Sequence, residues 1–337
     1  MGQAVRRGLS RRAVLGLATG LAGAARAAEP VRFLRIATGS VSGTYYPIGG
    51  VVAEIISNPP GSRPCERGGD CGVPGLVAVV QSSDGSIANI QAIERGEVES
   101  GFAQSDTVFA AWTGTGPFAD APARRIRALA NLYPESVHLV VRAGAGIATV
   151  RDLAGRSVSL DRDGSGTQAD ALLILDAFGV DVATLRVERL SAAEAIDSLA
   201  AGAIDAFFVV AGWPAAGVAE LADAGLIALI PLAGPEVEAL LERNPFFAVD
   251  RIPAGVYRGV PPIETISVGA QWLVAADLEE ALVYDIAVAF WRPEARAILD
   301  EGHPKGRSIR LETALDGVAI PIHPGAARFD REAGLLP

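Results

Sequence analysis

Residues 33–56 read FLRIATGSVSGTYYPIGGVVAEII, and this stretch predicts a strand, a tight turn and a helix in immediate succession. The strand covers Phe33–Ala37, and a turn rich in glycine and serine follows it. The helix is expected to begin near Tyr45 to Pro47, because proline is tolerated in the first helical turn, and apolar residues then recur at helical spacing. A strand–turn–helix unit of this kind is typical of an α/β domain.

The same alternation continues along the chain and predicts an α/β fold with a largely parallel sheet. A second unit has its strand at 157–160 and its helix at 167–178. Because single hydrophobic cores stop growing near ~250–300 residues, two lobes with a cleft between them are expected. The first lobe should comprise residues 28–138 plus 265–337, and the second lobe residues 139–264.

Extended segments are expected to connect these two lobes. Residues 127–132 and 137–142 are predicted as two separate strands, with Tyr133-Pro134-Glu135 between them. A further strand over 265–274 could return the chain to the first lobe.

The first 27 residues have the pattern of a cleaved signal peptide, with four early arginines, an apolar stretch over 13–25 and a small-x-small site at Ala25-Arg26-Ala27. Ser10-Arg11-Arg12-Ala13-Val14-Leu15 has the twin-arginine arrangement, and an ordinary secretory signal is the alternative. An uncleaved anchor is disfavoured because the apolar stretch is shorter than the ~20 residues of a spanning helix. We expect cleavage near Ala27 and a periplasmic protein.

Charge excludes two classes of partner. Removal of the segment's five arginines from the 29 Lys and Arg of the chain leaves 24 basic residues against 39 acidic ones, a formal charge of −15. A nucleic-acid-binding protein needs a basic groove, and a protein on an anionic membrane surface needs a basic face. The sequence therefore predicts neither function.

Cys65 and Cys71 are the only cysteines and are separated by five residues in PCERGGDCGVPG. In an oxidising periplasm, such a pair predicts a disulfide that closes a surface loop. Zinc is the alternative, but the sequence has no second Cys or His pair to complete four ligands. No metal or cofactor is predicted.

Three strand-to-helix junctions share one character, at residues 40–45, 104–106 and 164–168. Each places Ser or Thr hydroxyl groups and free backbone N–H groups at the start of a helix, where carboxylates and phosphates bind without a cationic side chain. Simple N-capping explains any one of them. Three together predict a ligand cleft, because such helix starts gather at one crevice in open α/β sheets.

Two enzymatic interpretations compete for the same residues. Gly39-Ser40-Val41-Ser42-Gly43 fits the G-x-S-x-G pattern of a serine hydrolase with Ser42 as nucleophile, but no helix begins directly after that serine, and His138, His303 and His323 are poorly placed as its base. Residues 164–169 formally fit a dinucleotide fingerprint, which is a weak match on its own.

The order of short motifs resembles the TAXI family, the extracytoplasmic solute receptors of one branch of the tripartite ATP-independent periplasmic (TRAP) transporters. The resemblance spans nearly the whole mature chain. Its motifs are Thr38–Gly49 (TGSVSGTYYPIG), Gly85–Asn89 (GSIAN), Gly96–Glu99 (GEVE), Gln104–Asp106 (QSD), Leu132–Glu135 (LYPE), Gly164–Thr167 (GSGT), Ile252–Tyr257 (IPAGVY) and His323–Arg328 (HPGAAR).

The resemblance implies a two-lobed periplasmic-binding fold of type II character and delivery of a small carboxylate, such as glutamate or 2-oxoglutarate, to a TRAP-type permease. The implied ligand-binding residues come from the three junctions, with Trp213 as a further candidate wall: Ser40, Gly43, Thr44, Tyr45, Gln104, Ser105, Asp106, Ser165, Gly166, Thr167 and Trp213. Tryptophan at position 213 departs from the pattern expected of the family and leaves the ligand's size open. The resulting hypothesis is a non-catalytic, monomeric receptor, with an exported hydrolase and a sensor subunit as alternatives.

Overall fold

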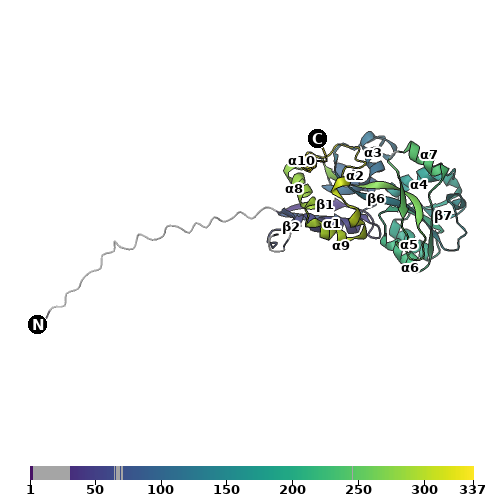
Figure 1. Cartoon of the computed structure of the whole chain (residues 1–337), viewed down its shortest axis with the longest axis horizontal. Coiled ribbons are helices and arrows are strands. Elements are labelled where there is room, and N and C mark those ends of the chain that lie inside the picture. Colours follow the sequence, from purple (N-terminus) through teal and green to yellow (C-terminus); the bar gives the residue numbers. More distant parts are fainter. Residues whose placement is uncertain (3–30, 64, 66–68, 70, 245) are drawn as a thin grey trace.

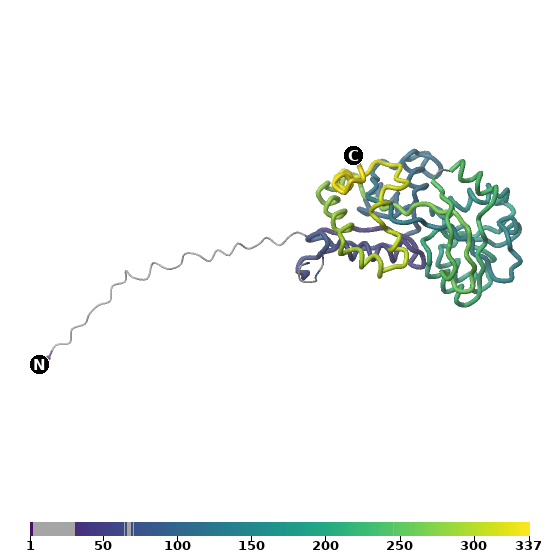
Figure 2. Tube along the Cα trace, in the orientation of Figure 1, coloured from purple at the N-terminus to yellow at the C-terminus, as the bar shows by residue number. Residues whose placement is uncertain are grey.

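The computed structural model describes residues 1–2, 31–63, 65, 69, 71–244 and 246–337. The predicted signal segment and its cleavage site at Ala27 lie outside the described residues, except for Met1 and Gly2. The body of the protein consists of two lobes side by side, and the chain passes from one to the other and back (Figures 1 and 2).

The strands and helices follow the predicted alternation. The strands are β1 Arg32–Ala37, β2 Ser57–Asn58, β3 Val73–Pro74, β4 Leu76–Gln81, β5 Ser100–Gln104, β6 Ile126–Arg142, β7 Ser157–Ser159, β8 Arg186–Glu188, β9 Ala206–Ala211, β10 Ile227–Ile230, β11 Ala248–Ile252 and β12 Ile263–Ala275. The α-helices are α1 Tyr45–Ile56, α2 Ser86–Glu94, α3 Ser105–Thr113, α4 Gly166–Ala177, α5 Ala192–Ala200, α6 Ala216–Asp223, α7 Pro235–Arg243, α8 Glu280–Trp291, α9 Ala295–Gly302 and α10 Pro324–Glu332.

One sheet runs through both lobes in the order β4-β1-β5-β12-β6-β9-β7-β8, with β10 beside β6 and β11 beside β12. The prediction of a largely parallel sheet is wrong in its centre. Parallel pairs occur at β1 with β4 and β5 and at β7 with β8 and β9, whereas β12 and β6 are antiparallel to all of their neighbours. The two long strands therefore join two small parallel sheets.

Strand β6 corrects a second expectation, because residues 126–142 form one strand instead of two. Pro134 suggested a break, since proline cannot donate to a ladder. In the structure it lies opposite Gly269 of β12, next to a register shift between Ala270 and Gln271, so the ladder continues around it.

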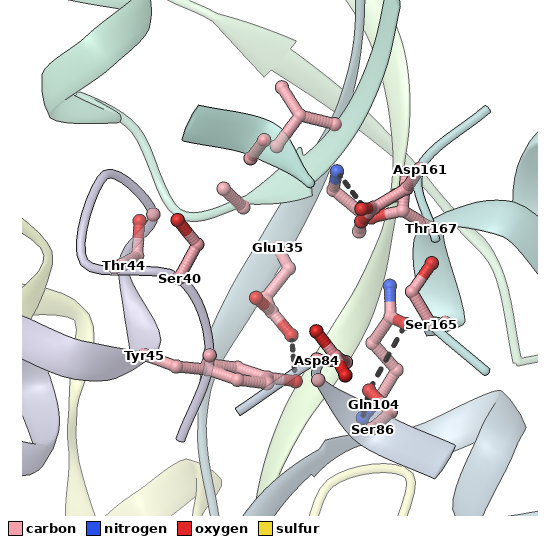
Figure 3. A pocket seen from close by; sticks show the side chains of 18 of the residues that line it. Ser40, Thr44, Tyr45, Asp84, Ser86, Gln104, Glu135, Asp161, Ser165 and Thr167 are labelled. Carbon is pink, nitrogen blue, oxygen red and sulfur yellow. Dashed lines mark hydrogen bonds between the residues drawn. The ribbon is translucent and has the colours of Figure 1, made fainter. Parts of the chain in front are cut away.

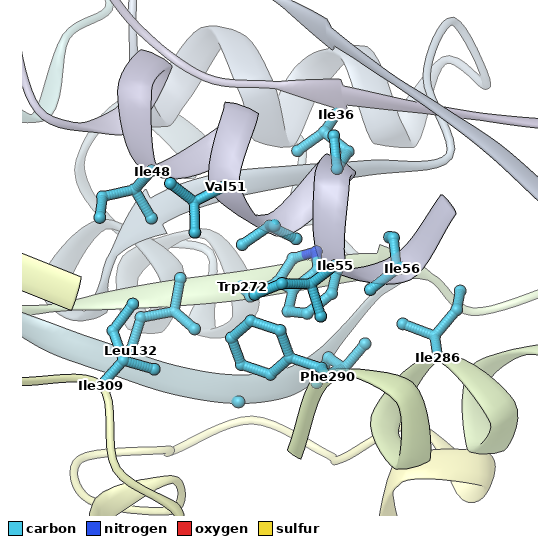
Figure 4. Close-up of a cluster of buried hydrophobic side chains, with 14 of the residues drawn as sticks. Ile36, Ile48, Val51, Ile55, Ile56, Leu132, Trp272, Ile286, Phe290 and Ile309 are labelled. Atoms are coloured by element: carbon cyan, nitrogen blue, oxygen red, sulfur yellow. The ribbon is translucent and has the colours of Figure 1, made fainter. Parts of the chain in front are cut away.

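Along β6 and β12, the buried side chains pass from the hydrophobic core of the first lobe to a core of the second lobe. Leu132 and Trp272 pack in the core of the first lobe, where Trp272 and Phe290 of α8 meet edge to face below α1 with ring centroids 5.2 Å apart (Figure 4). Val137 and Val268 pack in a core of the second lobe with α4 and α7. The short segments between these residues connect the lobes, and Glu135 lies in one of them. The residue bounds predicted for the lobes stay a prediction.

The predicted disulfide between Cys65 and Cys71 is present, with Cα atoms 4.7 Å apart. Over the described residues, none of the helices has the length and apolar character needed to span a membrane.

Candidate functional site

A polar cavity of about 70 Å³ lies between the lobes (Figure 3). Its walls come from the starts of helices in both lobes, from β9 and from the middle of β6. The lining residues are Gly39, Ser40, Gly43, Thr44, Tyr45, Ser83, Asp84, Gly85, Ser86, Gln104, Glu135, Asp161, Ser165, Gly166, Thr167, Ser191, Ala192, Val209, Val210 and Ala211. Its volume is well below the ~300–1,000 Å³ of pockets for drug-sized ligands, so this arrangement of the lobes suits a small ligand.

The turn after β1 forms one part of the first-lobe wall. Thr44 precedes α1 and is buried, and its hydroxyl donates to the carbonyl oxygen of Gly212 in the second lobe at 2.5 Å. The hydroxyl groups of Ser40 and Ser42 are hydrogen-bonded to each other at 2.8 Å. Tyr45, the first residue of α1, points its hydroxyl group toward Glu135 (Figure 3).

The start of α2 forms the other part of this wall, and the sequence reasoning did not include it among the ligand-binding residues. Ser83 Oγ accepts the N–H of Gly85, and Ser86 Oγ accepts the N–H of Gln104 at 3.1 Å. Asp84 reaches across the cleft to Arg162, with 3.0 Å between Oδ1 and Nη1. The local signal was present in Asp84-Gly85-Ser86, a helix-start pattern.

The start of α4 forms the second-lobe wall. Ser165 caps the helix by accepting the N–H of Gln168 at 3.0 Å. Thr167 Oγ1 accepts the N–H of Val210 at 3.1 Å, and its own hydroxyl hydrogen has no acceptor among the described residues. Both side chains are buried and line the cavity. The hydroxyl group of Thr167 can donate to an acceptor atom that enters the cavity, whereas that of Ser165 is hydrogen-bonded to Asp161 and lowers its pKa.

Gly166 allows the two lobes to approach closely. A Cβ atom at this position would lie 1.3 Å from Oε1 of Gln104 and 3.0 Å from Oγ of Ser86, both in the first lobe. Gln104 also donates from Nε2 to Oδ2 of Asp170 in α4 at 3.1 Å. Contact between the lobes at this point therefore requires glycine.

Two carboxyl groups in the cavity wall have raised pKa values. Burial, together with the nearby charge of Asp106, raises the pKa of Glu135 to about 8, although the hydrogen bond from Tyr45 and the charge of Lys305 act in the opposite direction. Burial also raises the pKa of Asp161 to about 6, against the hydrogen bond that its carboxylate accepts from the N–H of Arg162. The positive φ of Asp161, 74°, holds it in the left-handed region, which aspartate tolerates better than most residues.

Three predicted residues do not line the cavity. Ser105 Oγ accepts the N–H of Gly269, so it holds α3 against β12. Asp106 is buried behind the wall, and burial raises its pKa to about 6. Trp213 lies under Lys305, whose Nζ atom is 4.3 Å from the centre of the Trp213 ring. The other eight predicted residues, which are Ser40, Gly43, Thr44, Tyr45, Gln104, Ser165, Gly166 and Thr167, all line the cavity. Whether any of the eleven binds a ligand stays a prediction.

Ser42 has no catalytic partner in the part of the chain that the structure describes. His138 is hydrogen-bonded to Ser136 and Tyr257, and the imidazoles of His303 and His323 accept N–H groups of the residues two positions further on. Nor do the described residues contain a group of three or more His, Cys, Asp or Glu side chains that could hold a metal ion.

The two lobes, the sheet shared between them and the cavity at their junction define the class: the protein has the two-lobed α/β fold of the periplasmic binding proteins. It resembles the structure of a periplasmic transporter, with 17% identity, 82% of this chain and 88% of that chain covered and a TM-score of 0.51. A protein of Bordetella bronchiseptica RB50 matches with 15% identity, 90% and 89% coverage and a TM-score of 0.51. An alkanesulfonate-binding protein from Xanthomonas axonopodis pv. citri, bound to MOPS, has 18% identity, 91% and 85% coverage and a TM-score of 0.49.

Residues 36–334 match the NMT1-like family, and the chain belongs to this family.

Proposed function

We propose that this protein is a periplasmic solute receptor that holds a small carboxylic acid between its lobes and delivers it to a TRAP-type permease. The observation that carries the proposal is the polar cavity between the lobes, bordered by the starts of helices from both of them. Hydrogen bonds also join the lobes across it, as between Thr44 and Gly212 and between Arg162 and Asp84. A ligand in the cavity would contact both lobes and favour their closure.

The carboxylate part of the proposal rests on the hydrogen-bond donors of the wall. The first N–H groups of a helix have no partner within the helix, and the helix dipole favours an anion there. Helices α1 and α4 begin at the cavity from opposite lobes, and Thr167 adds a hydroxyl group that is free to donate. Thr44 already donates to Gly212, so its backbone N–H, rather than its hydroxyl group, would contact the ligand.

The TRAP-type permease and the periplasmic location are supported by the resemblance to TAXI receptors, whose opening motif forms the turn that borders the cavity. Binding is tested first, by thermal shift and calorimetry with glutamate, 2-oxoglutarate and related acids. A saturating ligand should raise the melting temperature by several degrees, since binding to the native state stabilises it. Failure of all acids to bind would contradict the proposal.

Delivery is tested separately. The receptor loaded with its acid should drive uptake into proteoliposomes that contain a TRAP-type permease from the same organism. Uptake that is the same with and without the receptor would contradict the role in transport while leaving the binding function intact.

A further inference from the structure

The side chains that line the cavity include three carboxyl groups, those of Asp84, Glu135 and Asp161, and no Lys, Arg or His. A site that recognised only an anion would place these acids against a charge of the same sign. When such an acid is ionised, it favours a cationic group of a ligand over an anionic one.

Two of the three acids already have partners. Asp84 forms an ion pair with the Arg162 side chain at 3.0 Å, and both side chains are partly exposed. Asp161 accepts the N–H of Arg162 at 2.8 Å from Oδ1. Asp84 therefore has a cationic partner, and the hydroxyl group of Ser165 is a second hydrogen-bond donor that lowers the pKa of Asp161.

Glu135 differs from both. Only 2% of its surface is exposed, and its side chain lies in the centre of the cavity wall, between the two lobes (Figure 3). Oε2 accepts the hydroxyl hydrogen of Tyr45 at 2.5 Å, and Oε1 has no hydrogen-bond partner among the described residues. The charge of Lys305 lowers the pKa of Glu135, but its ammonium group lies over the ring of Trp213, and the described residues show no ion pair between Lys305 and Glu135.

A buried carboxylate with one neutral hydrogen bond is poorly stabilised, because removing a charge from water is costly unless it is paired. We propose that the ligand carries an ammonium group as well as a carboxylate, and that Glu135 binds the ammonium group through Oε1 while Tyr45 holds Oε2. The ligand class is then a small α-amino acid, and not an oxo acid or a simple carboxylic acid. This inference rests on the proposed function, and it narrows the substrate class of the same cavity.

The test compares matched pairs of ligands that differ only at the α-carbon: L-glutamate with 2-oxoglutarate, and L-alanine with pyruvate, each measured by isothermal titration calorimetry on the mature protein. In a pair that binds, the amino acid should bind at least about tenfold more tightly than its oxo acid, as expected for one charge-assisted hydrogen bond. Equal or tighter binding of the oxo acid would overturn the inference and leave the carboxylate receptor intact. Absence of binding by both members of both pairs would count against the proposed function and this inference together.

Glu135→Gln keeps an oxygen that accepts the hydroxyl hydrogen of Tyr45, and it removes the ability of the side chain to become negatively charged when an ammonium group binds. It should weaken binding of the amino acid by roughly 10- to 100-fold and leave the oxo acid within about threefold, so that the preference disappears. Asp330→Asn is the matched control, because Asp330 is also a buried acid with a raised pKa but belongs to α10 and does not line the cavity. An unchanged preference in Glu135→Gln, or an equal loss in Asp330→Asn, would overturn the role of Glu135.

Discussion

Two sets of buried carboxyl groups lie within the junction of the lobes and differ in what they face. Glu135 lines the cavity, whereas Asp106 of α3 and Asp170 of α4 are sealed behind its wall. Burial raises the pKa in all three cases, and Asp106 raises that of Asp170 further. Burial and a raised pKa alone therefore do not distinguish a binding group from a structural one, and access to the cavity does.

Asp106 and Asp170, called the sealed pair below, join the lobes, because Asp106 belongs to the first lobe and Asp170 to the second. Gln104 Nε2 donates to Oδ2 of Asp170, while Oδ1 of each aspartate has no hydrogen-bond partner within the described residues. Glu135 and Thr107 are the other polar groups that influence the pair. Two like charges in this space would repel each other, so contact between the lobes requires that the pair retain a proton.

The largest expected effect is on the free energy of unfolding, and it comes from replacing one ionisable carboxyl group of this pair in Asp106→Asn. The folded pKa of Asp106, about 6, lies above its ordinary value of 3.8, so the folded state binds the proton more tightly. The contribution of this carboxyl group to the free energy of unfolding of the wild type is then fully present below about pH 4 and is lost as the pH rises through 6. The free energy of unfolding of the variant should gain up to about 3 kcal/mol over wild type between pH 4 and pH 7. Urea denaturation at several pH values measures the free energy of unfolding of both proteins. If it changes with pH in the same way in the variant and in the wild type, the two aspartates are not sealed from water in solution.

The second effect tests whether the lobes must touch at the sealed pair for binding to occur at the cavity. In Gly166→Val the new Cβ displaces Gln104 from Asp170, and overpacking of this kind costs about 1–3 kcal/mol, or roughly 5- to 150-fold in affinity. Gly50→Ala is the control, since a Cβ at Gly50 of α1 meets no atom within 4 Å. The control should bind normally and melt slightly higher. If calorimetry gives a normal ligand affinity for Gly166→Val, then contact of the lobes at this point is not needed for binding.

The sequence could predict the helix starts around the cavity because their signals are local. Ser40, Thr44 and Ser165 each stand in a glycine-rich turn directly between a strand and a helix, and this pattern places them at one crevice. The two-lobed fold followed from the same alternation. Local patterns could not predict the long antiparallel strands, since Pro134 suggested a break that pairing with β12 overrides.

The acids of the site could not be predicted in the same way. Glu135 acquires its role from Tyr45, ninety residues earlier in the chain, and from burial that only the packed lobes create. Its one sequence signal is a charged residue between two apolar segments that are predicted as separate strands. Conversely, Gln104-Ser105-Asp106 showed a helix start, but Ser105 is hydrogen-bonded to Gly269 and Asp106 is buried behind the wall, so neither lines the cavity.

A third prediction uses the pH dependence of binding to separate Glu135 from the sealed pair. Below pH 8 Glu135 is mostly protonated in the folded protein, and an ammonium group can bind only after that proton leaves. Amino-acid affinity should therefore rise about tenfold per pH unit from pH 6 to 7, with release of nearly one proton at pH 7. Calorimetry in buffers of different ionisation enthalpy measures the released proton. Glu135→Gln should abolish the proton release, and Asp106→Asn should retain most of it. If instead Asp106→Asn abolishes the release and Glu135→Gln retains it, the proton comes from the sealed pair and not from Glu135.

The smallest expected effect belongs to Ser42→Ala. The hydroxyl group of Ser42 contacts that of Ser40 and does not line the cavity, so its loss should change ligand affinity by no more than about twofold, as is usual for a partly exposed side chain away from a binding site. Gly43→Ala is a useful companion, because its Cβ would lie 3.4 Å from the carbonyl oxygen of Ser40, an ordinary contact, at a residue that does line the cavity. Affinity for the preferred acid and hydrolysis of ester substrates should be measured on both variants. Ester turnover by the wild type that Ser42→Ala abolishes would make this turn a nucleophile elbow. Retention of affinity without turnover would leave it as part of the wall that faces Glu135.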